Sequence, residues 1–129
     1  MSTNFYTGYY NKANKYREEG LKVVSISRTD PKGVELDGKL INLSPDSNTL
    51  WQLKNGEIDE EEYTRRYIAQ LESIGIRDIL LMIHQFGDEV VLCCWESPEK
   101  FCHRHLLADY INKNSKLKVY EKNWQIGSL

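Results

Sequence analysis

Short apolar runs alternate along this chain with longer segments in which apolar residues recur three or four positions apart. Runs rich in β-branched and aromatic residues are typical of β-strands. On this basis we expect strands at residues 5–6, 21–27, 89–94 and 117–120. Arg28 falls at the end of the second of these strands, directly before a turn that contains proline and glycine.

The segments between these runs carry the periodicity and the end signals of helices. Residues 11–19 are polar and helix-permissive until a glycine offers a stop. We expect Asp59 to cap the next helix, with Glu62 as its capping-box partner, and Gly75 to end it. Two further helices are expected, one directly after Gly75 and one through residues 106–111, because apolar residues recur along one side of each.

Strands that alternate with helices imply crossover connections and a mostly parallel sheet that is covered on both faces. We therefore predict an α/β fold, a small three-layer α/β/α sandwich. Residues 34–45 are expected to form a loop with a small hairpin at Asp37 and Gly38. No internal repeat, low-complexity tract or linker divides the sequence, so residues 1–129 are predicted to form a single domain.

Composition narrows the classes of function. The chain has 40% hydrophobic and 28% charged residues and a formal net charge of −2, which provides no basic field for sequence-independent binding of nucleic acid or anionic lipid. No apolar stretch approaches the roughly 20 residues that span a bilayer, and the polar first residues lack the features of a signal peptide. We expect a cytoplasmic protein with no membrane partner. Its three cysteines, an odd number, are expected to be reduced thiols.

Groups with chemical potential are concentrated after the strand at 89–94. Residues 93–104 read Cys-Cys-Trp-Glu-Ser-Pro-Glu-Lys-Phe-Cys-His-Arg, which brings thiols, a carboxylate, an imidazole and a guanidinium between a predicted strand and a predicted helix. Ligands of α/β proteins usually bind at such junctions. The segment therefore marks a candidate site more clearly than it identifies a reaction.

This segment also carries a resemblance. Residues 92–107, with Cys-aromatic-Glu followed by Cys-His-Arg, resemble the hallmark of a widespread family known as domain of unknown function 488 (DUF488). Residues 24–28 with 31–33 form a second matching block, and residues 6–9 form a weaker third. The resemblance implies an intracellular α/β domain and no particular reaction.

The residues of the hallmark suggest roles. Ser97 and Pro98 are a good helix start, so residues 102–104 lie either in the second turn of that helix or at the start of a separate main helix. In the second geometry, unpaired amides favour an anion or a thiolate. Three residues are predicted to be catalytic. Cys102 is the expected nucleophile, Glu96 a proton acceptor or orienting group, and His103 a base or a hydrogen-bond donor to an anion. The predicted ligand-binding residues are two cations, a thiol and an indole: Arg104, Arg28, Cys94 and Trp95.

The cysteines also have plainer interpretations. Cys102 lies close to leucines on the same helix, and a cysteine in that position is commonly a small core residue. Cys93 is expected to pack on the opposite face of the strand from Cys94, because neighbouring strand residues alternate. A redox pair of Cys94 and Cys102 requires the loop between them to fold back, and their seven intervening residues are not the spacing of thiol oxidoreductases.

Two familiar sites fit the spacing poorly. The Cys-x5-Arg cradle of cysteine phosphatases is absent, because Lys100 and Ala108 stand where arginine is needed. His103 and His105 are two positions apart and cannot share one helical face, and paired zinc-ligand spacings are missing. We therefore predict no metal site and no cofactor.

Two hypotheses of function follow. The first is an enzyme that acts on an anionic or nucleotide-like substrate at the Cys-x-Glu and Cys-His-Arg site. The alternative is a noncatalytic module that binds an anion, a nucleotide or nucleic acid. Aromatic residues that could stack on a base are plentiful, among them Tyr6, Tyr9, Tyr10, Trp51 and Trp95.

Overall fold

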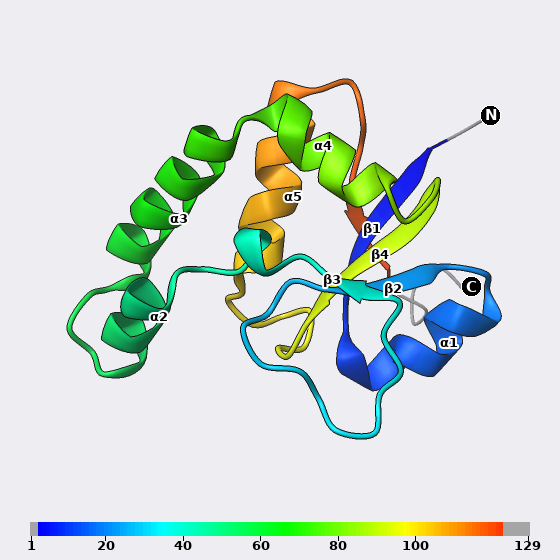
Figure 1. The fold of residues 1–129 in the computed structure, drawn as a ribbon. Coiled ribbons are helices and arrows are strands. Elements are labelled where there is room, and N and C mark those ends of the chain that lie inside the picture. Colours follow the sequence, from blue (N-terminus) through cyan, green and yellow to red (C-terminus); the bar gives the residue numbers. More distant parts are fainter. Residues whose placement is uncertain (1–2, 123–129) are drawn as a thin grey trace.

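The computed structural model describes residues 3–122, which form a parallel sheet between two layers of helices (Figure 1). The α/β class predicted from the sequence is confirmed. The strands are β1 (Asn4–Tyr9), β2 (Lys22–Ser25), β3 (Gly38–Lys39), β4 (Glu89–Cys94) and β5 (Tyr120–Glu121). The helices are α1 (Ala13–Glu18), α2 (Ser47–Lys54), α3 (Glu60–Ile74), α4 (Ile76–His84) and α5 (His103–Asn114), with short 3-10 turns at Tyr10–Lys12 and Ile41–Leu43.

The order of strands in the sheet determines where a ligand can bind. Within residues 3–122 the order is β3-β2-β4-β1-β5, and every neighbouring pair is parallel. The chain leaves β2 toward the β3 edge of the sheet, whereas it leaves β4 toward the β5 edge. Connections that depart in opposite directions open a crevice at the carboxyl ends of the two strands. The crevice therefore lies between the ends of β2 and β4.

Alternate residues of β4 enter two separate cores. Val90 and Leu92 pack with α3, α4 and α5 in the larger core. Val91 and Cys93 pack on the other face, against residues from the 3-10 turn after β1 and from α1. Figure 1 shows α1 on one side of the sheet and α3, α4 and α5 on the other. This arrangement is the predicted three-layer sandwich, and burial on both faces explains why β4 is apolar almost throughout.

Helices α3 and α4 begin and end at residues that the sequence indicates. The Asp59 carboxylate accepts a hydrogen bond from the Glu62 backbone N–H at 2.8 Å, as an N-cap does. The capping box expected from Glu62 is only half formed, because within residues 3–122 its carboxylate accepts from Arg65 and Arg66 and no bond to the Asp59 N–H is recorded. Gly75, with φ of +92°, separates α3 from α4. Among the helices of the described region, none is both long and apolar enough to cross a membrane.

The hairpin expected at Asp37 and Gly38 is wrong. Asp-Gly hairpins need positive φ at both turn residues, but Gly38 is not among the glycines with positive φ and belongs instead to β3, which runs parallel to β2. The Asp37 carboxylate accepts hydrogen bonds from the Val23 N–H at 2.7 Å and from Arg17 at 2.6 Å. The aspartate therefore fastens this segment alongside β2. Glycine is required at position 38 because a Cβ there would overlap the Phe86 ring.

The sequence prediction also omitted α2. This helix is short and mostly polar, so it lacks a clear apolar stripe, and Trp51 on its surface is 62% exposed. Its one local signal is Asp46, whose carboxylate accepts from the Thr49 N–H at 2.9 Å. Other boundaries shift by a few residues: β1 is longer than expected, and β5 begins where the expected final strand ends.

The tyrosines of α3 provide a test of how the core holds the crevice in place. Tyr67 is fully buried, its hydroxyl donates to the Leu43 carbonyl at 2.6 Å, and its ring contacts His103 edge-on. Tyr67→Phe would leave that carbonyl without its partner, and we expect it to lower the free energy of unfolding by about 1–3 kcal/mol. The matched control is Tyr63→Phe, one turn earlier, since no hydrogen bond of the Tyr63 hydroxyl is recorded within residues 3–122. Urea denaturation should show a loss below about 1 kcal/mol for the control. Equal losses in both variants would contradict this explanation.

Candidate functional site

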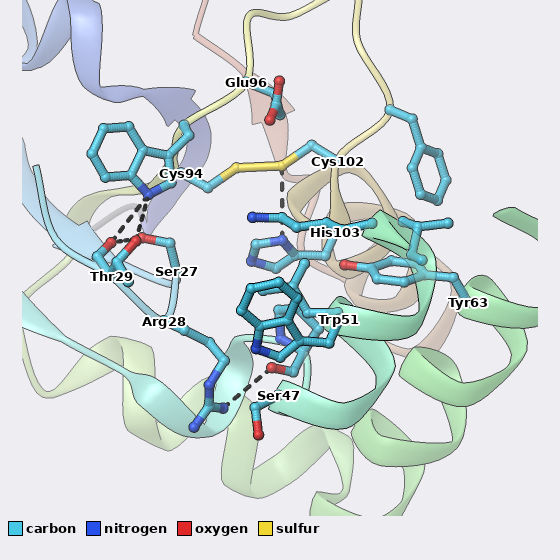
Figure 2. Close-up of a pocket in the computed structure, with 16 residues that line it drawn as sticks. Ser27, Arg28, Thr29, Ser47, Trp51, Tyr63, Cys94, Glu96, Cys102 and His103 are labelled. Atoms are coloured by element: carbon cyan, nitrogen blue, oxygen red, sulfur yellow. Dashed lines mark hydrogen bonds between the residues drawn. A yellow bond between two sulfur atoms is a disulfide. The ribbon is translucent and has the colours of Figure 1, made fainter. Parts of the chain in front are cut away.

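A cavity of about 620 Å³ occupies the crevice at the carboxyl ends of β2 and β4 (Figure 2). Six of the seven residues predicted for the site line it, and Arg104 is the exception. Most of the other lining residues come from the loop after β2, from α2 and from α3. The lining residues are Ser27, Arg28, Thr29, Pro45, Ser47, Leu50, Trp51, Leu53, Lys54, Tyr63, Cys94, Trp95, Glu96, Phe101, Cys102 and His103.

Two cysteines form part of the cavity floor. Cys94 is the last residue of β4 and Cys102 is the N-cap of α5, so the main helix starts directly after Cys102 and is separate from the turn at Ser97. The loop between them folds back, and the structure records a disulfide between their sulfur atoms, with the Cα atoms 7.8 Å apart (Figure 2). Both residues are buried. The expectation of three reduced thiols is therefore wrong for Cys94 and Cys102 in this structure, and a free Cys102 thiolate requires that the disulfide first be reduced.

His103 lies directly beside this pair and has a defined orientation. Its Nε2 lies 2.5 Å from the Ile26 carbonyl oxygen, so Nε2 carries the proton and donates it. Its Nδ1 then has a lone pair, and it lies 3.8 Å from the Cys102 sulfur. Burial lowers the pKa of His103 to about 4, the hydrogen bond to Ile26 opposes that shift, and the charge of Arg104 adds to it. The imidazole is therefore neutral near pH 7.

Arg104 lies behind the floor rather than in the cavity. Its side chain is 0% exposed and donates through Nε and Nη2 to both carboxylate oxygens of Glu121, at 3.0 and 2.9 Å. Its Nη1 donates to the Cys94 sulfur at 3.0 Å and to the Glu96 carbonyl at 2.6 Å. The predicted contact between Arg104 and a ligand does not fit this placement, because every guanidinium nitrogen faces protein. The sequence did not single out Glu121 as its partner.

Cys93 faces away from the cavity, as its position next to Cys94 in a strand requires. Its thiol is free and fully buried among apolar and aromatic side chains. Burial raises the pKa of this thiol, with a smaller opposing effect of Arg104. Cys93 is therefore a packing residue and provides a natural control for experiments on the other two cysteines.

The rim of the cavity carries the remaining predicted residues. Arg28 is exposed, and its Nη1 donates to the Pro45 carbonyl at 3.2 Å. The indole N–H of Trp95 donates to the backbone and side-chain oxygens of Thr29 at 3.1 and 3.2 Å, which holds a 49% exposed ring in place. The Glu96 side chain is exposed, and it lines the cavity. The structure thus brings a cation, an indole and a carboxylate around the sulfur and imidazole floor.

Several residues of the cavity were missed or only partly foreseen. Trp51, one of the aromatic residues that the sequence offers for stacking on a base, lines the cavity, whereas Tyr6 and Tyr9 do not. Tyr10 lies behind Trp95 and meets its ring edge-on at 5.2 Å. The wall formed by α2, including Lys54, could have been anticipated only from the Asp46 cap.

One cluster in the described region has the donor atoms to hold a metal ion. The ligand atoms of Cys94, Cys102 and His103 all lie within 4.8 Å of one another. His105 is not part of this cluster, and its Nδ1 lies 3.9 Å from a Glu121 oxygen instead. The ligand atoms that lie together are those of Cys94, at the end of β4, and of Cys102 and His103, at the start of α5.

Comparison with known proteins gives one finding. A family model described as the active DUF488-N3 subclade (DUF488-N3a) matches residues 6–115. The matched span includes the whole cavity lining and supports the resemblance inferred from the Cys-His-Arg block. No curated protein and no solved structure matches the chain.

The buried pair of Arg104 and Glu121 can be tested by removing one of its charges. Glu121→Gln leaves a fully buried guanidinium without its counterion, and such losses cost 3–5 kcal/mol in general. We expect about 3 kcal/mol, at the lower end, because the Glu121 side chain is 19% exposed. Glu72→Gln on the exposed surface of α3 is the control, with an expected change within about 0.5 kcal/mol. A thermal or urea transition of Glu121→Gln that coincides with the parent's would refute the structural role given to this pair.

Proposed function

Because the chain belongs to the DUF488 family, we propose that it is an enzyme that acts on an anionic, nucleotide-like molecule bound in this cavity. The observation that carries the proposal is the convergence of an exposed guanidinium, two exposed indoles and a floor of sulfur and imidazole on one cavity. The description of the matching subclade as active favours an enzyme over the noncatalytic module.

The anionic part of the ligand is assigned to Arg28. Only Nη1 of this guanidinium has recorded partners within residues 3–122, so Nε and Nη2 keep their donors for a two-pronged contact. Lys54 on α2 adds a second cation to the lining. Phosphate and carboxylate groups match the planar fork of arginine, which is why an anion is the expected ligand feature.

The flat part of the ligand is assigned to the two tryptophans. Trp51 and Trp95 both line the cavity while remaining 62% and 49% exposed. The indole face of an exposed tryptophan gains free energy when a nucleobase replaces the water that covers it. Each stacked base contributes about 1–3 kcal/mol to binding. Trp95 is already held by Thr29, so little side-chain entropy is lost when a ring covers it.

The reaction is assigned to the cavity floor, which Cys94, Cys102 and His103 form. An external dithiol supplies two electrons and two protons, is itself oxidised to a disulfide, and leaves Cys94 and Cys102 as thiols next to the unprotonated Nδ1 of His103. Cys102 also lies at the start of α5, where unpaired amides and the helix dipole favour negative charge. Cys102 and His103 place sulfur and imidazole at the reacting centre, and Glu96 on the rim accepts or delivers a proton. Arg104 holds the Cys94 end of the floor without contacting the ligand.

Binding can be tested with AMP as the probe, followed by calorimetry. Arg28→Ala removes a charge-assisted contact of about 1.5–3 kcal/mol, so AMP should bind at least about tenfold more weakly. Arg77→Ala is the matched control, because Arg77 is an exposed arginine on α4 outside this cavity. Unchanged affinity in Arg28→Ala would remove Arg28 from the proposed site. An absence of AMP binding to the parent would count against a nucleotide-like ligand.

Catalysis is tested separately by incubating the reduced protein with AMP, ATP and NAD and searching for products by mass spectrometry. Cys102→Ser is expected to abolish product formation and to leave AMP affinity within about threefold, because the anion and ring contacts lie elsewhere. Cys93→Ser, which changes the buried thiol on the other face, should retain turnover. Binding of AMP by the parent without any product would support the noncatalytic module instead.

A further inference from the structure

We infer that Cys94, Cys102 and His103, with both cysteines reduced, bind a zinc ion whose fourth coordination position opens into the cavity. The inference rests on the proposed function for the use of the metal, whereas zinc binding itself requires no substrate.

The donor atoms have the types and positions of a zinc site. Two thiolate sulfurs and one imidazole nitrogen form a Cys2His set, which zinc accepts readily. On a tetrahedral zinc ion, sulfur and nitrogen ligands lie about 3.6 Å apart. The Cys102 sulfur and the His103 Nδ1 lie 3.8 Å apart, and all three ligand atoms fall within 4.8 Å of one another. Small side-chain adjustments suffice to surround one ion.

His103 is oriented as a metal ligand usually is. A histidine that binds a metal through one ring nitrogen generally donates the other N–H to a carboxylate or a backbone carbonyl. The Nε2 of His103 donates to the Ile26 carbonyl at 2.5 Å, and Nδ1 therefore presents its lone pair to the sulfurs. Because Ile26 directly follows β2, the ligand is fixed by the sheet rather than by a loop side chain.

The backbone spacing of the two cysteines suits a bridging ion. Their Cα atoms are 7.8 Å apart, whereas disulfides usually span roughly 4.4–6.8 Å between Cα atoms. Two thiolates on a tetrahedral zinc ion lie about 3.8 Å apart, compared with about 2.05 Å in a disulfide. The chain positions of Cys94 and Cys102 therefore accommodate sulfurs held by a metal.

The charges also balance when zinc is present. Arg104 is already neutralised by Glu121, with which it shares two hydrogen bonds, so it cannot compensate two further thiolates. Two buried thiolates without a cation would carry a large desolvation cost. A divalent ion cancels both charges, and the hydrogen bond from Arg104 to the Cys94 sulfur then stabilises one thiolate ligand.

Three protein ligands beside a cavity are the arrangement of a catalytic rather than a structural zinc ion. All three residues line the cavity, so the fourth position is accessible to water or to a donor atom of the ligand. The sequence does not predict these three ligands, because Cys94 and Cys102 are separated by seven residues and Cys102 and His103 are adjacent, which matches no common zinc-ligand spacing. The helix start turns these two neighbours toward one point.

The test uses full-length protein purified and dialysed with a thiol reductant. Mass spectrometry of the metal content should find one equivalent of zinc for each chain. Replacement by Co²⁺ should produce the thiolate-to-cobalt charge-transfer absorption of a tetrahedral site. Cys94→Ser, Cys102→Ser and His103→Gln should each reduce bound zinc to about one tenth or less, since each removes one of three ligands. Cys93→Ser should keep its full equivalent.

Two results would overturn the zinc site. The first is a reduced parent protein that holds no stoichiometric zinc and shows no charge-transfer absorption with Co²⁺, a result that needs no variant to fold. The second is equal loss of zinc from Cys93→Ser while its circular dichroism matches the parent's. If the parent holds zinc but does not bind AMP, the proposed ligand is wrong and the zinc site stands. If the reduced parent holds no stoichiometric zinc but binds AMP, the zinc site is wrong and the proposed ligand stands.

Discussion

The fully buried guanidinium of Arg104 is the constraint on which the site depends. A cation with no exposure to water must satisfy all its donors within the protein, since an unpaired buried charge costs several kcal/mol. Arg104 meets this requirement by reaching β5 through Glu121, the end of β4 through Cys94 and the following loop through the Glu96 carbonyl. One side chain of α5 thus fixes the edge strand, the sulfur pair and the loop at the cavity rim.

The sheet supplies the second half of the geometry. Because β2 and β4 are parallel neighbours, their carboxyl ends meet, and residues far apart in the chain are brought to the same place. The bond between His103 and the Ile26 carbonyl joins α5 to the end of β2, just as Arg104 joins it to β4. The floor is therefore held by main chain and buried charge, while Arg28, Trp51 and Glu96 remain exposed around it.

The sequence was informative wherever a local signal determined the outcome. The apolar run of β4, the cap at Asp59 and the break at Gly75 act through neighbouring residues, and each predicted its element. Sequence alone could not place Asp37 beside β2 or Arg104 in the interior, because the partners that decide these roles lie many residues away. Arginine is usually exposed, so Arg104 was interpreted as a ligand contact. Only the fold shows that the Glu121 carboxylate pairs with the buried Arg104 guanidinium.

The hydrogen bond from the Trp95 indole to Thr29 has a consequence for selectivity. It links the loop after β4 to the loop after β2, so the two loops cannot separate until this bond is broken. Any ligand that must push the loops apart therefore loses about 1 kcal/mol of binding free energy, the cost of breaking a neutral hydrogen bond. Under the proposed function, a thin, planar ligand enters between the two loops without that cost, whereas a thicker ligand must first break the bond.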